Sequence, residues 1–237
     1  MRLDKYLVDE GYYESRNRAN DAIKAGLVMV DGKKGKPSTK IDENSIVEVE
    51  NTKFYTSRAA RKLENFLAEH AVDFTHKDAL DIGSSTGGFA QIVLENGVRS
   101  LTCVDVGKDQ LHISLREDSK VSLHEETDIR EFESEKGFEV ITCDVSFISI
   151  LKITDDIDRL AKEGTDIIIL YKPQFEVGKD VKRDSKGVVQ DIDAIARRKE
   201  AFEAEALKLG WEEKYQAESK VTGKEGNQEY LYHFKKL

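Results

Sequence analysis

The stretch Leu-Asp-Ile-Gly-Ser-Ser-Thr-Gly-Gly-Phe at residues 80–89 constrains the fold of this chain more than any other. Residues 79–82 form a short, mostly apolar run typical of a buried strand, and the small residues after it allow a tight turn into a helix beginning near Gly87. Glycines let a ligand lie against the backbone, and a helix start offers free N–H groups to a carboxylate or phosphate. The stretch therefore predicts a site for a nucleotide-type cofactor.

The spacing of these glycines narrows the choice of cofactor. A dinucleotide site needs Gly-x-Gly-x-x-Gly, and a Walker-type phosphate loop needs Lys where Phe89 stands. The pattern Asp-x-Gly-x-x-x-Gly-Gly-Phe instead resembles the first motif of S-adenosylmethionine-dependent methyltransferases; a structural corner without a ligand is the alternative. The resemblance implies that S-adenosylmethionine contacts Asp81, Gly83, Ser84, Ser85, Gly87, Gly88 and Phe89.

Length and composition fit a soluble chain with one α/β domain and a small extra module. The chain has 237 residues, of which 39% are hydrophobic and 35% charged. The first residues lack the apolar segment of a signal peptide, and the longest purely aliphatic run, 167–170, is far too short to span a membrane. Cys103 and Cys143 lie in apolar runs, which favours buried free thiols in a reducing compartment. We expect a cytoplasmic protein with no membrane partner.

Residues 1–50 predict a small α+β domain with two short helices and a strand hairpin. Three segments within it, 2–7 (Arg-Leu-Asp-Lys-Tyr-Leu), 15–19 (Ser-Arg-x-Arg-Ala) and 23–32 (Ile-Lys-Ala-Gly-Leu-Val-x-Val-Asp-Gly), resemble the S4 domain, an RNA-binding module. The net charge of −9 argues against nucleic acid, but residues 1–40 carry nine Lys or Arg and six Asp or Glu, so a local basic face is possible. The resemblance implies that RNA phosphates are bound by Arg2, Lys5, Arg16, Arg18 and Lys24.

Residues 51–57 predict a polar linker, and residues 58–72 an amphipathic helix with Arg58 and Lys62 on one face. From residue 78 strands and helices alternate, which predicts a parallel sheet covered on both faces. The expected strands are 79–82, 101–105, 121–124, 140–143 and 167–171, with helices at 87–96, 109–116, 147–162 and 192–209 and an antiparallel pair at 211–218 and 230–234. Residues 58–237 are therefore expected to form a Rossmann-like class I methyltransferase domain with a mostly parallel, seven-stranded α/β sheet.

Two acidic residues follow consecutive strands of this predicted sheet. Asp105 closes the second strand, where a carboxylate can accept both ribose hydroxyls of an adenosine. Asp128 follows the third strand and is expected to take the adenine amino group. Either residue alone would be read as a surface residue or a cap. Their positions after neighbouring strands favour a cofactor role.

The later strand ends supply further polar residues. Asp144 follows the fourth strand, in a segment without the prolines of amino-group methyltransferases, and Cys143 faces the opposite side, which disfavours cytosine C5 methylation by a thiol nucleophile. Lys172 ends the fifth strand before Pro173, although a lysine there can also reach solvent. Glu229 begins the last strand and alone would be taken for an exposed edge residue.

Together Lys62, Asp144, Lys172 and Glu229 resemble the Lys-Asp-Lys-Glu tetrad of FtsJ/RrmJ-like ribose 2′-O-methyltransferases. A ribose hydroxyl is a weak nucleophile, so a site of this kind must accept its proton or stabilise the developing alkoxide. We expect Lys172 to touch the 2′-OH, while the two carboxylates orient the lysines and limit the cost of burying like charges. In-line methyl transfer from a sulfonium needs no metal.

An S4-like module joined to such a domain is similar to the TlyA family of ribosomal RNA cytidine-2′-O-methyltransferases, whose members also carry a haemolysin label. The resemblance covers essentially the whole chain, including Lys-Pro-Gln-Phe-Glu at 172–176 and a basic loop, 177–191, in which Lys179 is expected to contact RNA. It implies a ribosomal RNA or ribosomal subunit as partner. Methylation of a base nitrogen, a membrane-active haemolysin, and a ribosome-associated RNA-binding factor with a vestigial cofactor pocket stay open, as do the nucleotide, the subunit and the oligomeric state.

Overall fold

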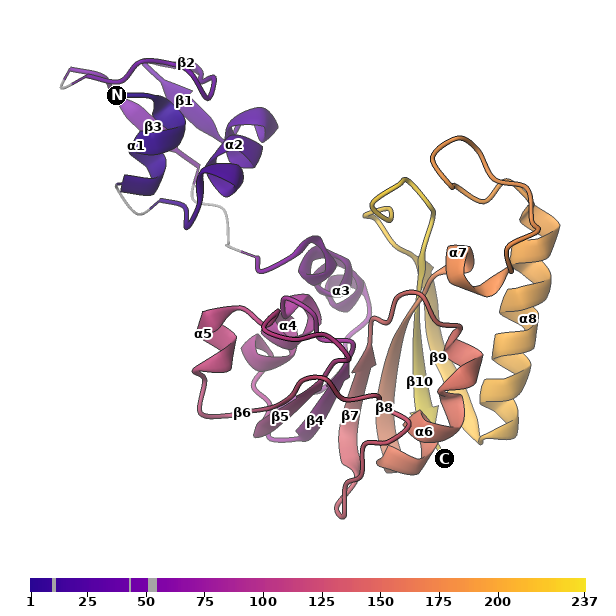
Figure 1. The fold of residues 1–237 in the computed structure, drawn as a ribbon. Helices are drawn as coiled ribbons and strands as arrows, with labels where there is room; N and C mark the ends of the chain where they lie inside the picture. Colours follow the sequence, from indigo (N-terminus) through magenta and orange to yellow (C-terminus); the bar gives the residue numbers. More distant parts are fainter. Residues whose placement is uncertain (10–11, 43, 51–54) are drawn as a thin grey trace. The chain divides into compact units, whose positions relative to one another are not determined.

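The structure is a computed structural model that describes residues 1–9, 12–42, 44–50 and 55–237 (Figure 1). The chain divides into two compact units, Met1–Phe54 and Tyr55–Leu237. Part of the predicted linker, residues 51–54, lies outside the described residues. Each unit is therefore considered by itself.

The first unit packs two helices against a small antiparallel sheet. The helices are α1 (Leu3–Asp9) and α2 (Arg16–Ala25), and the strands β1 (Val28–Val30), β2 (Lys33–Lys34) and β3 (Val47–Val49) lie in the order β2-β1-β3. The Ser15 side chain accepts a hydrogen bond from the backbone of Arg18 at the start of α2, and Gly26 ends the helix with φ of 79°. The predicted α+β fold of this unit is confirmed.

The second unit contains a seven-stranded sheet whose strand order is β6-β5-β4-β7-β8-β10-β9. Its strands are β4 (Asp78–Ile82), β5 (Ser100–Val104), β6 (Val121–His124), β7 (Phe138–Cys143), β8 (Ala161–Tyr171), β9 (Trp211–Glu218) and β10 (Tyr230–Lys236). Only β10 runs antiparallel to its neighbours, β8 and β9. The predicted mostly parallel sheet is confirmed.

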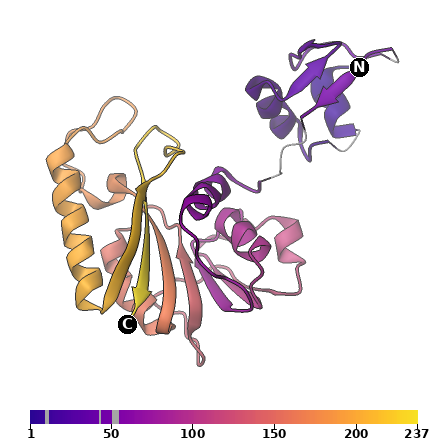
Figure 2. The ribbon, with the colours of Figure 1, turned by 180° about the vertical axis from the view of Figure 1, so that it is seen from behind.

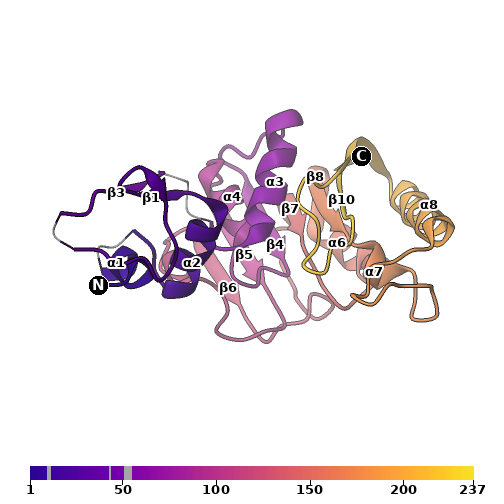
Figure 3. The same ribbon diagram turned by 90° about the horizontal axis from the view of Figure 1, so that it is seen from above.

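Helices cover both faces of this sheet (Figures 1, 2 and 3). One face carries α3 (Arg58–Glu69), α4 (Gly88–Glu95) and α5 (Ile113–Arg116), and the other carries α6 (Thr154–Leu160) and α8 (Ile192–Lys208). Successive residues of a strand point to opposite faces of the sheet, so each strand contributes to the hydrophobic core on both sides. Ala79 packs with α3 and α4, while its neighbour Leu80 packs with α6 and α8.

Two of the predicted helices are wrong in extent. In place of a helix over 147–162 there is a 3₁₀ turn, η1 (Ile150–Lys152), followed by α6, and residues 161–162 already belong to β8. Phe147 has φ of 66°, a left-handed conformation that a right-handed helix does not contain. Asp109, with φ of 53°, is likewise left-handed, and the helix predicted over 109–116 is reduced to α5. A short helix, α7 (Pro173–Glu176), was not predicted.

The centre of the sheet contains a topological switch point, because β4 lies between β5 on one side and β7 on the other. Ligands of open α/β sheets bind beyond the carboxyl ends of the strands at this place. Gly83 follows β4 there with φ of 77°, and a Cβ atom on it would lie 2.8 Å from the carbonyl oxygen of Asp144. Only glycine allows the loops after β4 and β7 to approach so closely.

Removing a ring from the core between the sheet and α8 should destabilise the fold strongly. Phe202 is 0% exposed, and its ring centroid lies 5.2 Å from that of Tyr232 and 5.4 Å from that of Tyr171. We expect Phe202→Ala to lower the free energy of unfolding by about 3–5 kcal/mol in urea titrations followed by circular dichroism. The control Leu207→Ala lies on the same helix at 73% exposure and should change it by less than about 0.5 kcal/mol. Equal losses would contradict the packing of α8.

Candidate active site

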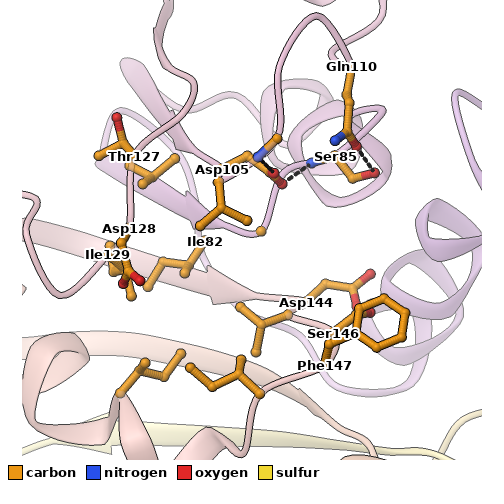
Figure 4. A pocket seen from close by; sticks show the side chains of 17 residues that line it. Ile82, Ser85, Asp105, Gln110, Thr127, Asp128, Ile129, Asp144, Ser146 and Phe147 are labelled. Carbon is orange, nitrogen blue, oxygen red and sulfur yellow. Dashed lines mark hydrogen bonds between the residues drawn. The ribbon is translucent and has the colours of Figure 1, made fainter.

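A cavity of about 450 Å³ opens at the switch point (Figure 4). Its walls come from the segments that follow β4, β5, β6 and β7. Apolar side chains line much of it, among them Val106 and Ile129, while Asp105 and Asp128 supply carboxylates. A mostly apolar cavity with a few fixed polar groups is typical of a small-molecule or cofactor site.

Asp105 is held against the glycine corner by backbone donors. The backbone N–H of Ser85 donates to Oδ2 at 2.8 Å, and that of Gly107 donates to Oδ1 at 2.6 Å (Figure 4). The Ser85 hydroxyl in turn donates to Oε1 of Gln110 at 3.1 Å. A carboxylate has about four acceptor positions, so Asp105 retains capacity to accept a pair of hydroxyl groups.

Asp128 lies on the same cavity wall with its carboxylate oriented by Arg130. The guanidinium of Arg130 donates from Nε to Oδ1 at 2.9 Å and from Nη2 to Oδ2 at 2.5 Å, and its backbone N–H donates to Oδ1 at 3.0 Å. These bonds hold the pKa of Asp128 well below its usual range. The group is therefore an ionised acceptor at neutral pH.

Asp81, in β4, is fully buried and only partly satisfied. Its Oδ1 accepts a hydrogen bond from the Thr142 hydroxyl at 2.7 Å, whereas Oδ2 has no hydrogen-bond partner among the described residues. Burial raises the pKa of Asp81 to about 7. The Ser84 hydroxyl close by in sequence is likewise buried and without a partner in the described chain. Of the two residues, Ser84 lines a cavity and Asp81 lines neither of the two cavities at this site.

The rest of the glycine corner joins helices as well as lining cavities. Gly87 caps α4 in a left-handed conformation. A Cβ atom on Gly88 would lie 2.1 Å from the Ser57 hydroxyl and 2.9 Å from the backbone nitrogen of Ala60, so this glycine lets α4 approach α3. Phe89 is 2% exposed in the core. Cofactor contacts by these three residues stay a prediction.

A second cavity of about 140 Å³ adjoins the first. The two share Gly83, Ser85, Asp144 and Ser146 as lining residues, and Lys172 lines only the smaller one. Asp144 therefore stands at the junction of a larger cavity with the shape of a cofactor site and a smaller one beside Lys172.

The four predicted catalytic residues form two ion pairs. Lys62 Nζ lies 2.5 Å from Oε2 of Glu229, and Lys172 Nζ lies 2.5 Å from Oδ1 of Asp144. Lys62, Lys172 and Glu229 are 8%, 9% and 2% exposed. Burial raises the pKa of Asp144, while the charge of Lys172 and, less strongly, that of Lys62 oppose this. Because the field of Lys62 reaches Asp144, the two pairs share one electrostatic environment.

The sheet register explains why residues so distant in sequence meet. Tyr171, the last residue of β8, pairs with Tyr230, the first residue of the antiparallel β10. Lys172 and Glu229 are the residues just beyond this pair, so they lie at the same edge of the sheet. Asp144 directly follows β7, the neighbour of β8 on its other side.

Two polar partners of the tetrad were not predicted. Lys172 Nζ donates to the Ser146 hydroxyl at 2.9 Å, and Gln174 Nε2 donates to Oε1 of Glu229 at 2.8 Å. Each stands two residues after a predicted catalytic residue, in Asp144-x-Ser146 and Lys172-x-Gln174. That spacing was the available signal, although the contacts themselves join residues 26 and 55 positions apart.

In the first unit, two of the predicted RNA-binding arginines are organised by a buried acid. Arg2 Nε lies 3.0 Å from Oδ1 of Asp4, and Arg16 Nη2 lies 2.7 Å from Oδ2. The hydrogen bonds from Arg2 and then Arg16 lower the pKa of Asp4, which is 1% exposed, while the arginine side chains are 52% and 57% exposed. Lys5 and Lys24 are exposed on α1 and α2, and Arg18 is half-buried. Arg2 and Arg16 are therefore exposed cations whose positions are fixed by Asp4.

In the second unit, Arg58 is exposed at the first residue of α3 and donates to the carbonyl of Thr222 at 3.3 Å. Lys179 is exposed in the loop 177–191, which projects from the same sheet edge as the loop 219–229 (Figures 1 and 2). Among the described residues there is no cluster of three or more metal-ligating side chains. No helix in the described part of the chain is both long and apolar enough to traverse a lipid bilayer.

The strand order, the glycine corner at the switch point and the acidic residues at successive strand ends define a Rossmann-like methyltransferase. Family models agree: that of the FtsJ-like methyltransferases matches residues 55–236, and that of the S4 domain matches residues 1–47. The 23S rRNA (cytidine-2′-O)-methyltransferase TlyA of Campylobacter jejuni is 45% identical over 99% of both chains, and Hemolysin A of Brachyspira hyodysenteriae is 38% identical over 99% of both. This chain belongs to the TlyA family, in which an S4 domain precedes an FtsJ-like methyltransferase domain.

A solved structure supports the fold alone. The N-methyltransferase NodS of Bradyrhizobium japonicum, in complex with S-adenosyl-L-homocysteine, matches 76% of this chain and 85% of its own with a TM-score of 0.51 at 16% identity. At that identity the likeness does not decide which atom is methylated here.

The buried Asp81 should make the fold less stable as pH rises. The unfolded chain releases this proton near pH 4, while the folded chain retains it until about pH 7, so ionisation favours the unfolded state between these values. We expect the stability of Asp81→Asn relative to the unaltered protein to grow from pH 4.5 to pH 7.5 by on the order of 2 kcal/mol in denaturant titrations. Asp180→Asn, at an exposed position, is the control and should show no such trend. A pH-independent difference for Asp81→Asn would contradict the assignment.

Proposed function

We propose that this protein is an S-adenosylmethionine-dependent RNA ribose 2′-O-methyltransferase that acts on ribosomal RNA, with a cytidine as the target. The observation that carries the proposal is the pair of buried ion pairs, Lys62 with Glu229 and Lys172 with Asp144. Asp144 and Lys172 line the smaller cavity, and the charge of Lys62 acts on Asp144. The Campylobacter jejuni relative is a 23S rRNA (cytidine-2′-O)-methyltransferase, which supports the substrate and the nucleotide.

The residues of the larger cavity fit S-adenosylmethionine. Asp105 would accept the ribose hydroxyls, Val106 and Ile129 would flank the adenine, and Asp128 would accept from its amino group. When bound, the cofactor supplies a methyl group activated by a sulfonium.

Lys172 and Asp144 are placed to handle the proton of the acceptor hydroxyl. They are 2.5 Å apart, and burial makes Asp144 more basic than an exposed carboxylate. Lys172 lies at the smaller cavity, where its Nζ atom would act as the general base that accepts the proton released by the 2′-OH on methylation. Ser146 fixes the Nζ atom by accepting a hydrogen bond from it.

Lys62 supplies a second cation to the same site. Glu229 neutralises it at 2.5 Å, which offsets the cost of burying an ammonium beside Lys172. A fixed, partly desolvated cation stabilises an oxyanion as it forms, since it needs no reorganisation at that moment. The two pairs thus divide the work: one moves the proton and the other stabilises the negative charge.

The first unit supplies RNA affinity. Asp4 holds Arg2 and Arg16 in fixed positions, so less side-chain entropy is lost when they meet phosphates. Lys5 and Lys24 add exposed charge on the neighbouring helices. Contacts of this kind position an RNA without reading its bases.

Lys172→Ala should abolish methyl transfer and spare cofactor binding. Loss of the proton acceptor should lower the rate by about 10²–10⁴-fold. The measurement is transfer of tritiated methyl groups to unmodified ribosomal subunits, with the product located by mass spectrometry and S-adenosylmethionine affinity measured by calorimetry. Lys172→Arg should be as inactive, because a guanidinium stays protonated.

Lys208→Ala, on the exposed face of α8, is the control and should transfer methyl groups normally. Methylation at a base nitrogen that survives Lys172→Ala would overturn the ribose assignment. Failure of the purified protein to bind S-adenosylmethionine would instead favour an RNA-binding factor with a vestigial pocket.

Substitutions in the first unit should weaken RNA binding without affecting the chemical step. Lys5→Ala and Lys24→Ala should each raise the dissociation constant for a ribosomal RNA fragment and flatten its dependence on salt by about one unit of slope. Fluorescence anisotropy between 50 and 200 mM salt, about the range where such slopes are measured, provides the readout. Unchanged slopes would remove these lysines from the interface.

A further inference from the structure

Glu229 has both carboxylate oxygens engaged by side chains from different elements. Lys62, on α3, donates to Oε2 at 2.5 Å, and Gln174, on α7, donates from Nε2 to Oε1 at 2.8 Å. The carboxylate is 2% exposed, so water does not compete for these positions. Two donors on opposite oxygens fix the plane of a carboxylate, whereas a single flexible lysine does not.

Gln174 belongs to the same rigid turn as Lys172. Pro173 begins α7 directly after Lys172, and the backbone N–H of Phe175 donates to the carbonyl of Lys172 at 2.9 Å. Lys172 and Gln174 are thus two residues apart in a closed turn, and each side chain reaches a different ion pair. Any displacement of this turn would move both pairs together.

The turn is anchored from outside by Arg183, in the loop 177–191. Its Nη2 donates to the carbonyls of Gln174 at 2.9 Å and Gly178 at 3.0 Å, and its Nη1 donates to that of Gly187 at 3.2 Å. The guanidinium therefore donates to backbone carbonyls in α7, just beyond α7 and in the loop 177–191. This holds the Gln174 backbone while its amide faces Glu229.

We propose that Gln174 is a positioning residue of the methyl transfer reaction. By donating to Glu229 from the turn that carries Lys172, it fixes the position of the Lys62–Glu229 pair relative to the Lys172–Asp144 pair. The proposal rests on the function proposed above and extends it to a residue outside the tetrad. It assigns Gln174 no contact with substrate or cofactor.

The test compares Gln174→Ala with Gln174→Glu by single-turnover kinetics across pH 6 to 9, about the range where such transferases are assayed. Gln174→Ala should lower kcat by about 10- to 100-fold at every pH, with the KM for S-adenosylmethionine unchanged. Gln174→Glu has nearly the same shape. Below the pH at which the two adjacent carboxylates lose their shared proton, the introduced acid still donates to Glu229, and above it the two groups repel.

The kcat of Gln174→Glu, divided by the kcat of the unaltered protein, should therefore fall by about 10-fold or more as pH rises. The same ratio for Gln174→Ala should not change with pH. The other charged groups facing this position are Lys62 from α3, Lys172 and Asp144, and they are the same in both variants. The matched control is Gln216→Glu, an exposed site on β9 with the same change of charge, which should behave like the unaltered protein.

A pH-independent ratio for Gln174→Glu, or normal kcat in Gln174→Ala, would overturn the proposal. A general folding defect would appear as lost cofactor binding in calorimetry and would not vary in this way with pH. If the unaltered protein makes no ribose 2′-O-methyl product, the proposed function fails; if it does and the Gln174 variants match it, only this inference fails.

Discussion

Two buried ion pairs at one edge of the sheet organise the second unit. Moving an ammonium and a carboxylate out of water is costly, and their attraction in the interior returns this only when the geometry is close and the remaining polar groups are satisfied. Both pairs have 2.5 Å separations and further bonds from Gln174 and Ser146, but Oδ1 of Asp144 and Oε1 of Gln174 make no hydrogen bond among the described residues. The condition is therefore only partly met. Pairs of this kind are weak evidence for stability, so the place of Lys172 and Asp144 on the smaller cavity favours a role in chemistry.

The topology of the sheet brings these charges together. Neighbouring strands β7, β8 and β10 end or begin at the same edge, because β10 runs antiparallel to β8. A residue that precedes β10 therefore lies beside a residue that follows β8. Had β10 been parallel, Glu229 would stand at the opposite edge of the sheet, and Lys62 would have no buried carboxylate to pair with.

Local pattern was sufficient for the sheet but not for the turns around the site. Apolar strand runs and the glycine corner depend on near neighbours in sequence, and they predicted the strands, the mostly parallel sheet and the position of Gly83. Phe147 escaped prediction, because its left-handed backbone follows from no local turn residue. The same loop is held by Glu176, which accepts hydrogen bonds from the Ser149 hydroxyl at 2.5 Å and the Ile150 backbone at 2.8 Å, contacts that span more than 25 residues.

The candidate site also contains both residues that the sequence predicted and residues that it did not. Family resemblance named the four tetrad residues. Asp144, Lys172 and Glu229 follow or precede strands that the pattern revealed, whereas Lys62 lies in the predicted helix. Ser146 and Gln174 were missed, since nothing in Asp-x-Ser or Lys-x-Gln says which oxygen the second side chain will meet until the strands are paired. Asp128 was correctly placed after a strand, yet its tight bonding by Arg130 could not be inferred from the strand pattern.

Asp81 shows the cost of burying a single acidic group. A buried carboxylate with one oxygen unsatisfied and its pKa raised to about 7 works against folding at neutral pH, and an apolar residue would fill β4 without that penalty. The tetrad has its counter-charges within the chain, whereas the unsatisfied oxygen of Asp81 has none among the described residues. Asp81 lines neither cavity, and its hydrogen bond from Thr142 joins β4 to β7 just before the corner that begins at Gly83. The buried acid therefore contributes to the contact between the two central strands that hold the site, and not to a cavity wall.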